Sequence, residues 1–305
     1  KIMVFDVGGT EIKYSVMDEQ MHRTDSGAVP TPQDTQAQFL DAVYRLYAPH
    51  KDEVSGIAMA LPGFVDNRTG YVSNGGALLY NTATPVGQLL AEKCGCPVIL
   101  ENDGKAAAMA ELANGALKDC CNAAVFIIGT GVGGGIIANG QLVRGVHFTA
   151  GEYSFVNTNA EAWDAPDQNM ACQCSTSNLL KWYRARKALP EDAPLDGRSF
   201  FAAANAGEPE ALEVLRRFCH AVAVQIYNLT VLLDVEKVAI GGGISKQPLL
   251  LESLRSAYDG LYASRAGQAY MEGLPRCQIV PCAFSSEANQ VGVAAAYFEA
   301  MQKKC

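Results

Sequence analysis

The chain is organised around residues 125–155, which read VFIIGTGVGGGIIANGQLVRGVHFTAGEYSF. An apolar run from Val125 to Ile128 leads into the glycine-rich sequence GTGVGGG, and a second apolar run follows from Ile136 to Ala138. This pattern predicts two strands joined by a turn whose glycines expose backbone N–H groups, a geometry that suits a phosphate. Glycine also serves tight turns and close strand packing, so both interpretations stay open for this stretch taken alone.

Two further junctions between an apolar strand and glycines occur far away in the chain. At the N-terminus, residues 1–5 run into DVGGT at residues 6–10, where a carboxylate at a strand end can hold hydrated Mg²⁺ beside a small, glycine-rich turn. Lys13 can add positive charge, although an ordinary β-hairpin with a surface lysine fits this segment equally well. Near the C-terminus, residues 238–245 read VAIGGGIS. Three such junctions in one chain favour phosphate binding over three unrelated turns.

These junctions, and the motifs between them, resemble the ROK family of sugar kinases, within the wider group that shares the fold of actin, Hsp70 and hexokinase. The matching motifs, in chain order, are DVGGT at Asp6, a PGFVD-type turn at Pro62, ENDGKAAAMAE from Glu101, GTGVGGGII followed by LVRG, AGE around Gly151, and GGGIS from Gly241. The resemblance implies an α/β, two-lobed actin-like ATPase (ribonuclease H-like) fold with duplicated mixed β-sheet domains and a cleft between them.

The resemblance also implies ATP and Mg²⁺ as cofactors, with Asp6 holding the metal through water. The Asp6 and Gly129 stretches would be two phosphate loops, and the Gly241 stretch would meet the adenosine. The residues assigned to the nucleotide in this way are Asp6, Gly8, Gly9, Thr10, Lys13, Gly129, Thr130, Gly131, Gly242 and Gly243.

The segment from Glu101 to Glu111 is expected to carry the chemistry. Asn102 and Asp103 follow an apolar strand and precede an alanine-rich helix, and from these residues alone a simple helix cap is the favoured interpretation. In the resemblance, Asp103 is instead the general base, which accepts the proton of a sugar hydroxyl as its oxygen attacks the γ-phosphate. Asn102 would then fix the acceptor hydroxyls by hydrogen bonds.

Two other segments are expected to contact the sugar. The loop SNGGAL at residues 73–78 does so in the family, and we assign Gly76 to this role, although a plain surface loop remains an equal alternative. Glu152 matches a family glutamate whose carboxylate suits vicinal hydroxyls. His147 is interpreted as an ordinary, partly exposed residue, because the family motif does not require it.

The sequence departs from the family pattern after Glu152. Many members continue with a GExGH motif and then CxCGxxGCLE, which gives a structural zinc site of one His and three Cys. Here Phe155 stands at the His position, Leu179 at the third Cys and Lys181 at the final Glu, so that only the two thiols of residues 172–174 remain. Because tetrahedral zinc needs four ligands, we expect no structural zinc.

The same replacements bear on specificity. In the resemblance the lost His and Glu hold the sugar near its anomeric and 2-hydroxyl side, and an aromatic ring at Phe155 can instead receive an apolar or glycosyl substituent. The serine-rich CSTS segment is similar to the branch that contains β-glucoside kinases. We therefore expect a hexose or hexoside to be phosphorylated on its 6-hydroxyl, with free glucose not necessarily preferred.

Apolar patterning predicts two similar halves, each running strand, strand, strand, helix, strand, helix, strand, with extra helices in the second half. We interpret this as an internal duplication that gives mixed sheets and not a Rossmann repeat. The expected strands are residues 2–5, 12–17, 24–28, 54–60, 98–100, 123–128, 134–138, 141–144, 238–240 and 278–281. The expected helices are residues 35–47, 177–188, 209–233, 249–258 and 288–301.

The predicted small lobe is residues 1–103 plus the C-terminal helix 288–305, and it carries the first phosphate loop and the sugar contacts. The predicted large lobe is residues 104–287, with the second phosphate loop and the adenosine loop. Within it, residues 160–207 are expected to be a polar excursion, irregular apart from the helix at 177–188, that covers the site and contributes to a homodimer.

Charge and cysteine usage limit the function classes. The formal net charge of −8 leaves no basic footprint for nucleic acid or anionic lipid, and no apolar run approaches the roughly 20 residues that span a bilayer. We therefore expect neither nucleic acid nor a membrane as a partner. Ten cysteines in a chain of this size, with no signal peptide before the first strand, predict mostly free thiols in the cytoplasm.

Other function classes remain in competition with the kinase. A sugar-sensing ROK protein without catalysis stays open, because the changes at Phe155 and Lys181 affect binding residues. A ROK repressor would need a helix-turn-helix before the first strand, and Asp6 is already the sixth residue. A filament protein or chaperone is disfavoured by the END and AGE motifs.

Overall fold

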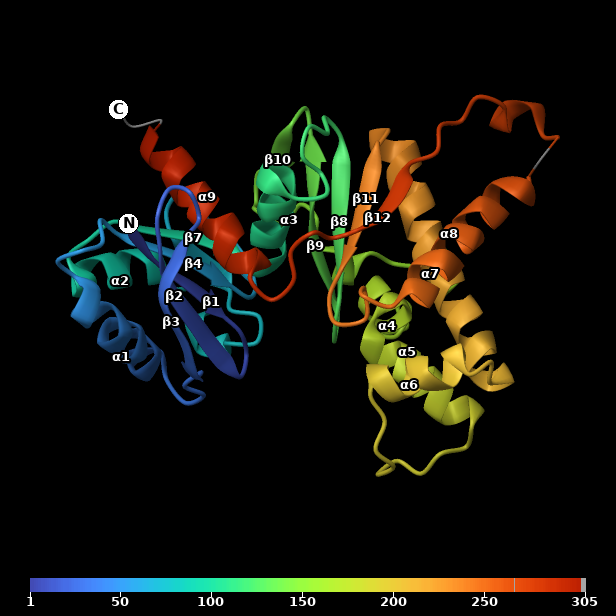
Figure 1. Ribbon diagram of the computed structural model, residues 1–305, viewed down its shortest axis with the longest axis horizontal. Helices are drawn as coiled ribbons and strands as arrows, with labels where there is room; N and C mark the ends of the chain where they lie inside the picture. The colour runs from blue at the N-terminus through green and yellow to red at the C-terminus, as the bar shows by residue number, and fades with distance from the viewer. Residues whose placement is uncertain (266, 303–305) are drawn as a thin grey trace. The chain divides into compact units, whose positions relative to one another are not determined.

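The computed structural model describes residues 1–265 and 267–302, which form two compact units (Figure 1). The first unit combines residues 1–115 and 142–150 with the C-terminal segment from residue 286. The second unit combines residues 116–141 and 151–285. Across the described residues, no helix combines the length and apolarity that a bilayer span requires.

The first unit is built on a mixed sheet. Its strands are β1 (Ile2–Val7), β2 (Glu11–Met17), β3 (Arg23–Pro30), β4 (Ile57–Leu61) and β7 (Val98–Asn102). They lie in the order β3-β2-β1-β4-β7, with β1 antiparallel to β2 and parallel to β4, and β4 parallel to β7. A small separate sheet pairs β5 (Phe64–Asp66) with β6 (Tyr71–Asn74). The parallel strands therefore bring their carboxyl ends to one edge of the sheet.

Helices cover both faces of this sheet. They are α1 (Gln36–Tyr47), α2 (Val86–Cys94), α3 (Asp103–Asn114) and α9 (Ala288–Gln302). Because strand side chains alternate, Met3, Phe5 and Val7 share a core with α1 and α2. The same alternation turns Asp6 toward the other face, where α9 lies (Figure 1).

A second sheet, built almost entirely from the second unit, repeats this one. Its strands are β8 (Ala123–Ile128), β9 (Val132–Ala138), β10 (Gln141–Val143), β11 (Lys237–Gly241) and β12 (Gln278–Pro281). They lie in the order β10-β9-β8-β11-β12, with β8 antiparallel to β9 and parallel to β11, and β11 parallel to β12. The order matches that of the first unit strand for strand, which confirms the predicted duplication and the mixed sheets.

Helices α4 (Met170–Cys174), α5 (Thr176–Arg186), α6 (Gly197–Asn205), α7 (Pro209–Leu233) and α8 (Pro248–Ala263) share one hydrophobic core with the second sheet. The predicted helix at 209–233 is confirmed in full. The expectation that residues 160–207 are irregular outside one helix is wrong, because α4 and α6 also form. Helix α6 begins at a capping box between Asp196 and Ser199 and buries Phe200 and Phe201 completely in the core.

Single-turn 3₁₀ helices complete the structure: η1 (Ala48–His50), η2 (Leu79–Asn81), η3 (Tyr153–Phe155), η4 (Ala160–Ala162) and η5 (Ala269–Met271).

The compact units divide the chain differently from the predicted lobes. Helix α3 groups with the first unit because it packs tightly on α9: a Cβ added at Gly292 would lie 1.7 Å from the carbonyl oxygen of Ala106. Residues 142–150 also group with the first unit, where the Nε of Arg144 donates to Oε2 of Glu101 at 2.8 Å. Residues 303–305 of the predicted small lobe, and residue 266 of the large lobe, lie outside the described residues.

Candidate active site

Asp6 occupies the carboxyl end of β1, with Lys13 directly opposite it on β2. Its Oδ1 accepts a hydrogen bond from the Nδ2 of Asn289 on α9, at 2.9 Å. Burial raises the pKa of Asp6 above its usual value, while the bond from Asn289 and the charge of Lys13 oppose this shift. A carboxylate that is costly to ionise gains from a nearby cation, so this donor set fits a hydrated Mg²⁺.

The turn after Asp6 is held by side chains from residues 31–33. The carbonyl of Gly8 accepts a hydrogen bond from Thr31 Oγ1 at 2.8 Å, and that of Gly9 accepts one from Gln33 Nε2 at 2.7 Å. A Cβ added at Gly9 would lie 3.2 Å from the Cβ of Ala77, so the turn lies against the predicted sugar loop. Thr10, at the end of the turn, is exposed. The first unit therefore brings a predicted nucleotide segment and a predicted sugar segment together.

The sugar loop is packed on the end of β4 through glycines. Gly63 has φ +92°, and a Cβ there would lie 2.0 Å from the carbonyl oxygen of Asn74. Gly76 has φ +57°, and a Cβ there would lie 2.8 Å from the backbone nitrogen of Gly63. Its own N–H donates to Oδ1 of Asn74 at 2.8 Å. Both glycines thus occupy left-handed conformations at a contact between two backbones, where a side chain has no room.

Asn102 ties this loop to the start of α3. Its Nδ2 donates to the carbonyl of Gly63 at 2.9 Å, and its Oδ1 accepts from the backbone N–H of Lys105 at 3.0 Å. Asn102 is therefore the N-cap of α3, as the residues alone had favoured, and it also anchors the glycine contact. Asp103 follows as the first residue of α3, partly buried, with its Oδ1 accepting from the backbone N–H of Gly104 at 2.7 Å.

In the second unit, the two remaining glycine segments lie side by side. Strand β8 ends beside β11, where Ile127 pairs with Gly241. Gly242 has φ +95°, and a Cβ there would lie 2.1 Å from the carbonyl oxygen of Ile128, immediately before Gly129. For Gly243 the space around an added Cβ is open within 4 Å. The predicted second phosphate loop and adenosine loop thus share one edge of the second sheet.

Helix α5 supports the Gly129–Gly131 turn. The backbone N–H of Thr176, at the start of α5, donates to the carbonyl of Gly129 at 2.8 Å. Within the turn, Gly129 N–H donates to the carbonyl of Gly131 at 3.0 Å, while Thr130 is exposed at the tip. A Cβ at Gly131 would lie 3.1 Å from Oγ of Ser154.

Glu152 lies just before η3 and is partly buried. The turn that carries it is fixed to β9, because the hydroxyl of Tyr153 donates to the carbonyl of Gly135 at 3.1 Å. Phe155 ends the same 3₁₀ turn, with its N–H donating to the carbonyl of Glu152 at 3.2 Å and its side chain 70% exposed. Lys181 is exposed on α5, and His147 is exposed in the first unit.

Cys172 and Cys174, the two cysteines that remain of the family zinc motif, lie in different environments. Cys174 is fully buried, and burial raises the pKa of its thiol to about 12. Cys172 is partly buried, with its Sγ 3.7 Å from the carbonyl oxygen of Pro166. Within residues 1–265 and 267–302, no group of three or more His, Cys, Asp or Glu side chains is placed to hold a metal ion. Cys305 lies outside the described residues.

Sequence reasoning missed the residues that hold the motifs in place. Asn289, Thr31, Gln33 and Thr176 were not among the predicted site residues, and each contacts its partner across a long stretch of chain. Only Thr176 lay in a segment that the sequence singled out, the serine-rich CSTS. Arg144 was noted within LVRG, but nothing in the sequence indicated its pairing with Glu101.

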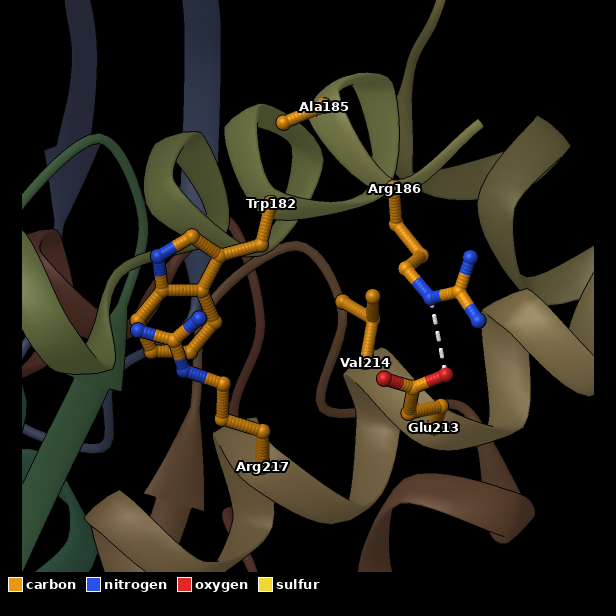
Figure 2. A pocket seen from close by; sticks show the side chains of 6 residues that line it. All are labelled: Trp182, Ala185, Arg186, Glu213, Val214 and Arg217. Atoms are coloured by element: carbon orange, nitrogen blue, oxygen red, sulfur yellow. Dashed lines mark hydrogen bonds and ion pairs between the residues drawn. The ribbon is translucent and has the colours of Figure 1, made fainter. Parts of the chain in front are cut away.

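A separate pocket of about 320 Å³ lies between α5 and α7 in the second unit, and none of the predicted site residues lines it. Figure 2 shows the guanidinium of Arg217 stacked over the indole of Trp182. The guanidinium carbon lies 3.8 Å from the ring centroid. On the other side, the Nε of Arg186 donates to Oε2 of Glu213 at 2.8 Å.

Comparison with known proteins agrees with this architecture. The model of the ROK family matches residues 2–302. A β-glucoside kinase of Listeria innocua is 30% identical over 257 residues, covering 84% of this chain and 86% of the relative. A ROK family protein from Streptococcus pneumoniae TIGR4, solved with sucrose, superposes with a TM-score of 0.86 at 27% identity, covering 99% of this chain and 100% of the other. A ROK family glucokinase from Streptomyces griseus, solved with glucose and AMPPNP, gives a TM-score of 0.78 at 25% identity, covering 97% and 98%. The sheet order, the glycine contacts and the match over nearly the whole chain lead to one conclusion: this chain belongs to the ROK family and has the actin-like fold of its sugar kinases.

Proposed function

We propose that the chain is an ATP-dependent carbohydrate kinase that phosphorylates the 6-hydroxyl of a hexose or hexoside, with Asp103 as general base. The observation that carries this proposal is the junction of β7 and α3. There Asn102 links the glycine contact of the sugar loop to the start of the helix, and Asp103 follows immediately. The related β-glucoside kinase and the glucokinase with bound glucose and AMPPNP support a sugar and an adenine nucleotide as substrates.

The reaction assigns one proton to Asp103. The carboxylate accepts the proton of the sugar hydroxyl while that oxygen forms a bond to the γ-phosphorus of ATP. The bond between the γ-phosphorus and the bridging oxygen of ADP breaks, and that oxygen keeps the electron pair. Glu152 and the loop around Gly76 are assigned to the other sugar hydroxyls. Asn102 is also assigned a sugar contact, in addition to the two hydrogen bonds that its side chain makes to Gly63 and Lys105.

The glycine segments are assigned to the nucleotide. The turns at residues 8–10 and 129–131 would bind phosphate oxygens through backbone N–H groups, and Gly242 and Gly243 would border the adenosine. Asp6 would hold Mg²⁺ through water, with Lys13 beside it, and Mg²⁺ when bound neutralises charge on the phosphates.

Phe155 is assigned to substrate selection. Its exposed ring ends the 3₁₀ turn that begins after Glu152, so it can pack against a substituent on the sugar that Glu152 holds. The β-glucoside kinase relative and the neighbour solved with sucrose both favour a substrate larger than a free hexose.

We therefore expect turnover of cellobiose to exceed that of glucose in a panel that also includes mannose, fructose and N-acetylmannosamine. Phe155→Ala is expected to lower kcat/KM for cellobiose by about five-fold and to leave the glucose value unchanged, and strong activity confined to free glucose would contradict this assignment.

The test of the proposed reaction is ADP release that depends on added sugar. Wild type is expected to release ADP, and Asp103→Asn is expected to lower kcat by roughly 10²–10⁴-fold with the circular dichroism spectrum unchanged. A sugar sensor without catalysis would instead bind sugar and release no ADP in either form.

The homodimer and the cytoplasmic location stay predictions, and light scattering of the purified protein tests the first of these.

A further inference from the structure

We propose that Glu101 and Arg144 form a positioning pair that holds the β7–α3 junction, and with it Asp103, in the geometry that phosphoryl transfer requires. This inference rests on the proposed role of Asp103 as the general base.

Glu101 is the residue before Asn102, and its side chain is 1% exposed. One carboxylate oxygen, Oε2, accepts from the Nε of Arg144 at 2.8 Å and from the Nδ2 of Asn67 at 3.5 Å. The other oxygen, Oε1, accepts from the backbone N–H of Asn102 at 3.1 Å. The carboxylate therefore binds the backbone of the junction on one side and the guanidinium of Arg144 on the other.

Arg144 contacts both elements that meet at Asp103. Its Nε reaches Glu101 at the end of β7, and its Nη2 lies 3.4 Å from the Sδ of Met109 on α3. One rigid guanidinium thus touches the strand before the base and the helix after it. The fork of an arginine allows both contacts at once, whereas the single ammonium of a lysine does not.

The segment that carries Arg144 has a second attachment in the first unit. The guanidinium of Arg68 lies 4.5 Å from the ring centroid of Phe148, and Phe148 is buried. Residues 142–150 are therefore fixed at Arg144 and again at Phe148. The chain continues directly into Gly151 and Glu152, the glutamate assigned to the sugar. This segment is thus attached at two points to the unit that carries Asp103.

Loss of stability alone does not separate a positioning role from a purely structural one, because removing one partner of a buried ion pair destabilises the fold in either case. The separating measurement is kinetic. If the pair acts through Asp103, breaking it matters only while Asp103 is present, since residues that act as a unit are not additive.

The experiment places Glu101→Gln and Arg144→Lys each in the wild-type and in the Asp103→Asn background. In the wild-type background, each substitution is expected to lower kcat by about 10- to 100-fold, as displacement of a reacting group does, with the KM for ATP unchanged. In the Asp103→Asn background, the same substitutions are expected to leave kcat unchanged. Equal losses in both backgrounds, or no loss in the wild-type background, would overturn the positioning role.

Glu213→Gln supplies a matched control. The Arg186–Glu213 pair (Figure 2) joins the same two atoms, Nε and Oε2, at the same 2.8 Å. Its side chains are 50% and 52% exposed. Breaking it is expected to change neither kcat nor KM.

Arg144→Lys keeps the positive charge beside Glu101, so the test can be made with this variant if Glu101→Gln does not fold. Full activity of Asp103→Asn by itself would overturn both the general base and the positioning pair. If Asp103→Asn is inactive but the pair substitutions lower kcat by the same factor in both backgrounds, only the positioning pair is overturned.

Discussion

Asn102 makes two hydrogen bonds that substitutions can separate. Asn102→Ser keeps an oxygen that can cap α3 but is too short to reach the carbonyl of Gly63. Asn102→Ala removes both bonds. The lost cap costs about 1 kcal/mol, and the lost bond to Gly63, from a side chain in a residue only 6% exposed, costs about 1 kcal/mol more. We therefore expect Ser to destabilise the protein by about 1 kcal/mol and Ala by about 2 kcal/mol.

The effect on the sugar follows a different order. The bond from Asn102 holds Gly63, against which the backbone of Gly76 packs. Both variants lose this bond and the amide that is assigned to the sugar, so both are expected to raise the KM for the sugar, and the loop contributes the same factor to each. If about 1 kcal/mol of loop order is lost, this factor is about five, because 1.4 kcal/mol corresponds to ten-fold.

Two assays measure these effects. Urea unfolding of the nucleotide-free protein, followed by circular dichroism, gives the shift in midpoint, and sugar-dependent ADP release gives KM. Thr35→Ala is the control, because Thr35 caps α1 in the same unit through its Oγ1 and belongs to none of the predicted site segments. It is expected to lower stability with no change in KM. A wild-type KM in Asn102→Ser would refute the argument, since that variant has lost the bond to Gly63.

Three further predictions concern the nucleotide segments and the cysteines. Gly242→Ala is expected to raise the KM for ATP by ten-fold or more, because φ is +95° and the added Cβ would meet the carbonyl of Ile128. Strain of this kind costs about 1–3 kcal/mol. The control is Gly260→Ala in α8, where the added Cβ has open space. Burial raises the pKa of Asp6 above its unfolded value, so its ionisation at neutral pH costs stability, and this cost vanishes as the pH falls below both values. Asp6→Asn is thus expected to raise the thermal midpoint of the nucleotide-free protein at pH 7, with a gain that shrinks toward acidic pH, while Mg²⁺-dependent ADP release is lost; a lower midpoint at pH 7 would count against this account. Chelation is expected to leave the thermal midpoint unchanged and metal analysis to find no zinc, whereas one tight zinc per chain that disappears on mutating Cys172 and Cys174 would contradict this prediction.

The sheets were predictable from sequence because their central strands are buried on both faces and read as apolar runs that end at glycines. Strands β1, β8 and β11 are of this kind, and the repeated element order revealed the duplication. Strands β5 and β6 were missed because they are only three and four residues long, and β6 is largely exposed, so neither gives a long apolar run. Helix α6 was missed because its polar start, with the capping box at Asp196, masked the two buried phenylalanines.

The site was predictable in its motifs and not in its supports. Glycines at Gly63 and Gly76 mark the backbone contact, but sequence spacing gives no sign that Asn102 binds the first of them. The partner of Asp6 is Asn289, from the opposite end of the chain. The N-cap of Asn102, favoured on local grounds, is present in the structure, and this local role does not conflict with a neighbouring catalytic aspartate.

The packing of α9 on α3 affects how the protein is made. The ribosome delivers the chain from its N-terminus, yet the first unit needs residues from 286 onward to cover α3 and to supply the partner of Asp6. The second unit, residues 116–141 and 151–285, is synthesised before that segment emerges. Residues 1–115, although synthesised first, therefore complete their packing only after the segment from residue 286 has been synthesised.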